Sequence, residues 1–204
     1  MHTPEKWNMG SIDKIQQFIT EFGFAALISN NLEASHIPLL LSKKEGELGV
    51  LYGHFARSNP HWKSLNNTEV LAIFSGPHSY ISPTWYETQP SVPTWNYSAV
   101  HVVGSIQLTD DETTLKTLEE TIEKYEPSLL ENGGFIPEEY KVKLSKGIVG
   151  FKIIISKLQG KEKLGQHRNS NDQIGVTSAL AKSSNIDDQQ LHQYMQRNQV
   201  GIGS

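Results

Sequence analysis

The sequence contains no cysteine among its 204 residues. Disulfide bonds, thiolate metal ligands and thiol nucleophiles are therefore excluded, and this composition fits the reducing cytoplasm. The sequence also lacks an apolar run of the roughly 18 to 20 residues that a membrane span requires. Residues 1–10 lack the apolar core of a signal peptide. We therefore expect a cytoplasmic protein with no membrane segment.

Excess charge and the common nucleotide-binding motifs are missing as well. The 18 basic and 22 acidic residues leave a formal charge of −4, so a broad surface for nucleic-acid phosphates is not expected. No Rossmann glycine pattern, P-loop, serine-nucleophile elbow or paired-histidine metal motif is present. No helix-turn-helix stands out either, so direct DNA binding is doubtful and no metal is assigned.

The pattern of apolar residues predicts a mainly β protein with flanking helices (α+β). Six short apolar runs are separated by turn residues, at 24–29, 37–41, 48–52, 70–74, 97–108 and 150–158. Their close spacing favours an antiparallel sheet or small barrel, because parallel neighbours need long crossovers. Helical spacing predicts helices over 11–19 and 111–125, the second capped near Asp110.

The length suggests one main domain followed by a tail. We assign residues 1–160 to the barrel and residues 161–204 to a polar C-terminal segment. Short helices are expected over 176–181 and 187–197, and residues 201–204 are expected to be disordered.

A polar cluster, Gly53 to Trp62, follows the strand at 48–52. Arg57 with nearby short donors could bind a phosphate. The alternative is a helix start, with Ser58 or Asn59 as the cap and Pro60 in the first helical position.

Two further segments are rich in aromatic side chains and hydroxyls, at 76–86 and 92–104. Ser82 and Thr84 could hydrogen-bond a planar ligand, and Trp95 and Asn96 could lie at its edge. The alternative is that the aromatic side chains fill the core or form an ordinary strand entry.

Three runs together resemble the PaiB family of FMN-binding negative transcriptional regulators. They are 54–62 (HFARSNPHW), 76–86 (GPHSYISPTWY) and 92–104 (VPTWNYSAVHVVG). The likeness extends from the MHTP start through SHIPLL at 35–40 to KLGQHR at 163–168. The last run usually reads KLSQNR in the family, so Gly165 and His167 depart from it.

The resemblance implies a split β-barrel related to pyridoxamine-phosphate oxidase, in an antiparallel, six-stranded, Greek-key-like form. It implies a homodimer with FMN at the subunit interface. On this basis the phosphate would be held by Ser35, His36, His54, Arg57 and Asn59. The other cofactor-binding positions would be Ser82, Trp85, Thr94, Trp95, Asn96, Gln166 and Arg168.

The resemblance leaves two functions open, and no catalytic residue is assigned in either. One is a transcriptional regulator or flavin-dependent redox protein of the PaiB type. The alternative is a flavin or haem oxidoreductase that uses NAD(P)H and has no direct contact with DNA.

Overall fold

The computed structural model describes residues 1–131 and 136–203. The chain forms two compact units. The first is made of residues 1–15, 75–100 and 159–204, and the second of residues 16–74 and 101–158. This division differs from the predicted boundary at residue 160, because one strand runs from Ile148 to Lys163.

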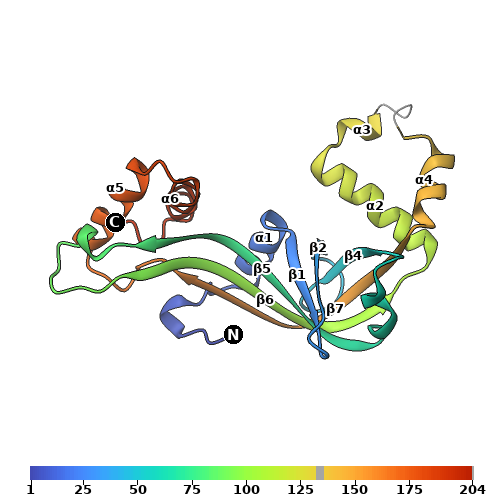
Figure 1. Ribbon diagram of the computed structural model, residues 1–204, viewed down its shortest axis with the longest axis horizontal. Coiled ribbons are helices and arrows are strands. Elements are labelled where there is room, and N and C mark those ends of the chain that lie inside the picture. Colours follow the sequence, from blue (N-terminus) through green and yellow to red (C-terminus); the bar gives the residue numbers. More distant parts are fainter. Residues whose placement is uncertain (132–135, 204) are drawn as a thin grey trace. The chain divides into compact units, whose positions relative to one another are not determined.

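A mainly antiparallel sheet forms the second unit (Figure 1). Its strands hydrogen-bond in the order β2-β1-β5-β6-β7-β4-β3. Three of them, β5, β6 and β7, continue into the first unit. The bounds are β1 Phe24–Ser29, β2 Ala34–Pro38, β3 Leu40–Ser42, β4 Val50–Ala56, β5 Thr68–Ile81, β6 Thr94–Leu108 and β7 Ile148–Lys163.

The register of the strands places alternate apolar side chains in the core of the second unit. Leu27 of β1 lies opposite Ala72 of β5, and both are fully buried. Phe55 of β4 and Phe151 of β7 pack with ring centroids 4.8 Å apart. This core fixes the ends of β2 and β4, where the predicted phosphate ligands lie.

The mainly β fold is confirmed, but the predicted number of six strands is wrong. The apolar run at 37–41 divides at Leu39, whose amide donates to the carbonyl of Gly23 at 2.8 Å. Residues before Leu39 pair with β1, and residues after it pair with β4. One apolar run therefore contributes two strands, and the sheet has seven strands within the described residues.

The helices are α1 Ile12–Glu21, α2 Asp111–Tyr125, α3 Ser128–Glu131, α4 Glu138–Ser145, α5 Ser170–Lys182 and α6 Ile186–Asn198, with 3-10 turns η1 Glu5–Trp7, η2 Pro60–Ser64 and η3 Pro83–Trp85. The predicted bounds of α2 are confirmed, and Asp110 caps it by accepting from the amide of Thr113 at 2.8 Å. No helix within residues 1–131 and 136–203 is long and apolar enough to cross a membrane.

Helices α5 and α6 pack against each other in the first unit. Gly175 of α5 lies so close to η3 that a Cβ there would be 2.1 Å from the carbonyl oxygen of Trp85. Gly201 is buried, and the amide of Gly203 donates to Gln173 Oε1 at 2.9 Å. Residues 201–203 are therefore placed against the first unit instead of being disordered, and Ser204 lies outside the described residues.

Candidate cofactor site

A chain of hydrogen bonds organises the ends of β1 and β2 in the second unit. The hydroxyl of Ser29 donates to the Asn31 side chain, so Ser29 Oγ must accept from His61 Nε2 at 2.9 Å. This fixes the tautomer of His61 and leaves Nδ1 to accept the hydroxyl proton of Ser35 at 2.9 Å. His61 is fully buried, and burial lowers its pKa. The neutral ring is therefore the form that this network requires.

Asn59 joins the same network and also begins a 3-10 turn. Its Nδ2 donates to Ser35 Oγ at 3.1 Å, and its Oδ1 accepts from the amide of His61 at 3.0 Å. The expected cap at Asn59 is therefore confirmed, with Pro60 in the first position of η2. Ser35 already donates one bond and accepts another, so it has no further proton for a phosphate.

Arg57, the predicted phosphate clamp, binds the backbone of its own unit. Its Nε and Nη2 donate to the carbonyls of Lys146 and Ile148, each at 2.7 Å. Trp62 Nε1 donates to the carbonyl of Arg57 at 3.1 Å. The side chain is exposed, and Nη1 with one hydrogen of Nη2 takes no part in these bonds. A phosphate ligand would have to use those remaining hydrogens.

His36 of β2 and His54 of β4 have different surroundings. His36 is exposed and its ring stacks on Phe24 at 6.1 Å between centroids. Burial lowers the pKa of the His54 ring. A neutral His54 can donate one hydrogen bond and accept another, but it supplies no charge for an anion.

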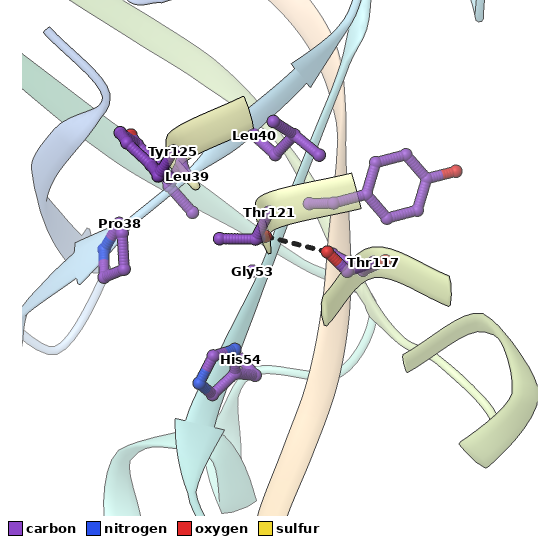
Figure 2. Close-up of a pocket in the computed structure, with 9 residues that line it drawn as sticks. Pro38, Leu39, Leu40, Gly53, His54, Thr117, Thr121 and Tyr125 are labelled. Carbon is purple, nitrogen blue, oxygen red and sulfur yellow. Dashed lines mark hydrogen bonds between the residues drawn. The ribbon is translucent and has the colours of Figure 1, made fainter. Parts of the chain in front are cut away.

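His54 lines a pocket between β4, the segment at 38–40 and helix α2 (Figure 2). The pocket is small, about 20 Å³, which is room for little more than one water molecule. Its polar groups on the helix side are Thr117, Thr121 and Tyr125. The hydroxyl of Thr121 is occupied, because it donates to the Thr117 carbonyl at 2.7 Å. This pocket was not predicted from the sequence, because α2 and β4 are far apart in the chain.

Ser82 and Trp85 lie at η3 in the first unit. Ser82 Oγ caps the turn by accepting from the amide of Thr84 at 3.2 Å, and the two hydroxyls are 2.8 Å apart. Trp85 is half-buried, with its carbonyl against Gly175 of α5. Both predicted ligand residues therefore have a local structural role.

The predicted trio at the start of β6 divides between two faces of the strand. Trp95 is 48% exposed and lies beside His78 and Tyr80 of β5, with centroids 5.9 and 6.3 Å away. Asn96 is only 2% exposed and lines a small pocket within the first unit. Thr94 accepts from Lys163 Nζ, which also donates to the Trp95 carbonyl at 2.8 Å.

Gln166 and Arg168 follow β7 and are held by their own surroundings. Gln166 closes the turn, since its Oε1 accepts from the amide of Leu164 at 2.8 Å and its Nε2 donates to the Glu162 carbonyl at 2.7 Å. Arg168 lies 4.3 Å above the Tyr86 ring and 3.8 Å from buried Asp172. Arg168 shares the small pocket with Asn96.

The structure therefore places the predicted residues in two groups. Ser35, His36, His54, Arg57 and Asn59 belong to the second unit, and Ser82, Trp85, Thr94, Trp95, Asn96, Gln166 and Arg168 belong to the first. The predicted cofactor-binding positions did not include Lys163, although it begins the KLGQHR run and its Nζ donates to the Trp95 carbonyl. The available signal was its alternation with Lys161 along β7.

Comparisons with known proteins identify the family. Residues 1–157 match the family described as "Putative FMN-binding domain". The chain is 34% identical over 205 residues to "Protease synthase and sporulation protein PAI 2" of Bacillus subtilis, covering 96% of this chain and 97% of that protein. It is 37% identical over 188 residues to an uncharacterized protein of Emericella nidulans, covering 73% of this chain and 75% of that one.

Solved structures share the fold at low sequence identity. The flavocytochrome Anf3 of Azotobacter vinelandii matches 74% of this chain and 66% of its own, with a TM-score of 0.54 at 15% identity. An FAD and haem binding protein of Mycobacterium smegmatis matches 79% and 75%, with a TM-score of 0.55 at 12% identity. The predicted family, split-barrel fold and FMN cofactor are thereby confirmed. The chain belongs to the PaiB family and is an FMN-binding split-barrel protein.

Proposed function

We propose that the protein is a homodimeric, FMN-dependent redox protein. The observation that carries this proposal is the exposed aromatic face formed by His78, Tyr80 and Trp95 on β5 and β6. An exposed group of aromatic rings suits a planar ligand or a partner surface. Lys163 adds an ammonium group at the edge of the same strands.

The phosphate of FMN requires donors that are not already used. In the second unit we propose Arg57, through its remaining guanidinium hydrogens, together with His36 and the second Nδ2 hydrogen of Asn59. We propose that Ser35 positions Asn59, because its own proton goes to His61. His54 would contribute a neutral hydrogen bond at most.

In the first unit we propose that Trp95 packs on the flavin ring and that Thr94 and Lys163 hydrogen-bond its polar edge. Two of the three ammonium hydrogens of Lys163 are directed at Thr94 and the Trp95 carbonyl, which leaves one. We propose an indirect, structural role for three residues that contact their own unit: Asn96, Gln166 and Arg168. When bound, FMN supplies the electron-transfer chemistry, and the chain's residues bind, orient and shield it.

The test begins with the visible spectrum of the purified protein. FMN is then titrated into colourless protein, and NADH or NADPH is added under anaerobic conditions. We expect saturable quenching of flavin fluorescence, and bleaching of the flavin band with at least one donor. FMN binding without reduction by either donor would argue against a nicotinamide-dependent reductase. A haem spectrum would favour the haem alternative.

The homodimer is tested separately by light scattering after gel filtration, with and without FMN. Trp95→Ser removes an exposed ring from the aromatic face, which we propose to lie at the dimer interface, and Tyr140→Ser is a control on a different exposed aromatic residue. We expect only Trp95→Ser to weaken association. A monomer at all concentrations in the wild type would reject this part of the proposal.

A regulatory role is the second candidate, favoured by the match over 97% of "Protease synthase and sporulation protein PAI 2". The acidic net charge favours output through a protein partner over direct contact with an operator. A gel-shift assay with genomic promoter fragments at moderate salt tests this point. Specific retention of a fragment would show that the protein reads DNA directly.

A further inference from the structure

Four basic side chains in the first unit converge on one indole ring. The ammonium groups of Lys6, Lys161 and Lys163 lie 4.7, 5.3 and 5.8 Å from the centroid of Trp7. The His167 ring meets the same indole edge-on, with centroids 5.9 Å apart. These five residues are called the Trp7 cluster below.

The strand geometry of β7 explains why the lysines gather there. Side chains alternate along a strand, so Lys161 and Lys163 share one face and Glu162 points to the other. Glu162 is buried on that opposite face, where it binds Lys14 and accepts from the hydroxyl of Tyr194 at 2.6 Å. The N-terminal segment reaches β7 through a bridge between Asn8 and Lys161, which brings Trp7 over the lysines.

The cluster has no counter-charge within the described part of the chain. No carboxylate there lies within 4.0 Å of the ammonium groups of Lys6, Lys161 or Lys163. Lys161 is only 7% exposed. It donates to the His2 carbonyl at 3.1 Å and lies 5.2 Å from the Tyr97 ring. Ring and carbonyl contacts offset only part of the cost of burying an ammonium group.

Two buried donors in the N-terminal segment are also unused. Trp7 Nε1 and Thr3 Oγ1 are buried and make no hydrogen bond to any described residue. A buried N–H or O–H without a partner is rare, because the lost hydrogen bond to water is not replaced. The Trp7 cluster therefore lacks a counter-charge among the described residues, and some of its hydrogen-bond donors lack an acceptor there.

We propose that the Trp7 cluster binds an oxyanion, namely the phosphate or carboxylate group of a small molecule. One oxyanion supplies both the missing charge and the missing acceptors. Lys161 would contribute a charge-assisted bond, Lys163 would contribute the attraction of its nearby charge, and Trp7 would contribute its indole N–H. Burial and then the charge of Lys161 lower the pKa of Lys163, and the negative charge of a bound anion would favour its ammonium form. The oxyanion could be the phosphate of FMN or could belong to a separate anionic metabolite.

The first experiment titrates inorganic phosphate into FMN-free protein at constant ionic strength. Side-chain NMR of His167 and tryptophan fluorescence report binding. Burial and then the charges of Lys6, Arg168 and Lys163 lower the pKa of His167, so a bound anion should raise it. We expect a saturable response that Lys161→Gln weakens at least about tenfold, since a charge-assisted bond is lost.

Two matched variants sharpen this test. Trp7→Phe keeps an aromatic ring and removes the indole N–H, and should also weaken phosphate binding, as followed by His167. Lys182→Gln removes the same charge from an exposed position of the first unit, and should bind phosphate like the wild type. Unfolding curves for each variant show whether it is folded. If Lys161→Gln does not fold, the proposal is tested with Trp7→Phe instead.

A competition experiment then identifies the source of the oxyanion. If FMN abolishes the phosphate response and riboflavin does not, the phosphate of FMN occupies the cluster, and the phosphate site proposed at Arg57 is rejected while FMN binding itself stands. If phosphate still binds to the FMN complex, the ligand is a separate anion. A wild type without a saturable response, or an equal loss in Lys182→Gln, would overturn the proposal. Because phosphate is titrated without FMN, that failure would leave the proposed flavin function standing.

Discussion

Replacing Arg57 with alanine separates a structural role of this side chain from a role in binding FMN. The guanidinium group donates to the carbonyls of Lys146 and Ile148 at 2.7 Å each. Exposed hydrogen bonds of this kind contribute about 0.5 to 1 kcal/mol each. We therefore expect the free energy of unfolding of FMN-free Arg57→Ala to fall by roughly 1 to 2 kcal/mol, measured by urea denaturation.

The affinity for FMN is the second measurement on the same variant. If Arg57 uses its remaining hydrogens on the phosphate, the loss is about 1.5 to 3 kcal/mol, which is roughly a 10- to 150-fold rise in Kd. Fluorescence titration of FMN measures it. An unchanged Kd together with the expected loss of stability would refute the phosphate role and leave Arg57 as a structural residue only.

Trp62→Phe provides the control for this experiment. It removes the 3.1 Å hydrogen bond from the indole to the Arg57 carbonyl but keeps an aromatic ring and the guanidinium group. We expect lower stability with little change in the Kd for FMN. If Trp62→Phe weakens FMN as much as Arg57→Ala, the shape of the turn controls affinity and the charge does not.

Three further predictions concern stability. Gly175→Ala should cost about 1 to 3 kcal/mol, measured by urea denaturation, because its Cβ would clash with the Trp85 carbonyl. Asp110→Ala removes the N-cap of α2, in which Asp110 Oδ1 accepts from the amide of Thr113. It should lower the free energy of unfolding by about 1 kcal/mol, seen as a lower thermal midpoint. Burial lowers the pKa of His61 below its unfolded value of 6.5. The unfolding midpoint should therefore be constant above pH 6.5 and decrease as the pH falls below it, because the unfolded state then binds more protons than the folded state. A midpoint that does not change down to pH 5 would contradict this.

Capping residues and apolar periodicity were sufficient to predict those elements whose structure depends on residues near in the sequence. Helix α2 follows from its cap and apolar period, and its observed bounds are the predicted ones. The turn at Asn59 and Pro60 also follows from capping chemistry. The division of the run at 37–41 could not be predicted, because it depends on a hydrogen bond between Leu39 and Gly23.

The candidate site also combines features that neighbouring residues determine with features that depend on distant ones. The strand period of two separates exposed Trp95 from buried Asn96, and this could have been predicted from their adjacent positions in a strand. The partners of Arg57 could not, because Lys146 and Ile148 are 89 and 91 residues away. Composition shows that a guanidinium group is present, but only the fold shows how many of its hydrogens are used.

The two groups of candidate residues differ in how many hydrogen-bond donors remain available for an anion. In the second unit, the chain of bonds from Asn59 through Ser35 and His61 to Ser29 has a single direction, so its inner hydroxyls are already occupied. An anion there must bind at the outer hydrogens of Asn59 and Arg57. In the first unit, Lys161 and Lys163 have no carboxylate partner within the described ranges. Anion affinity should therefore depend more strongly on these lysines than on Ser35, and comparing phosphate binding by Lys161→Gln and Ser35→Ala measures that difference directly.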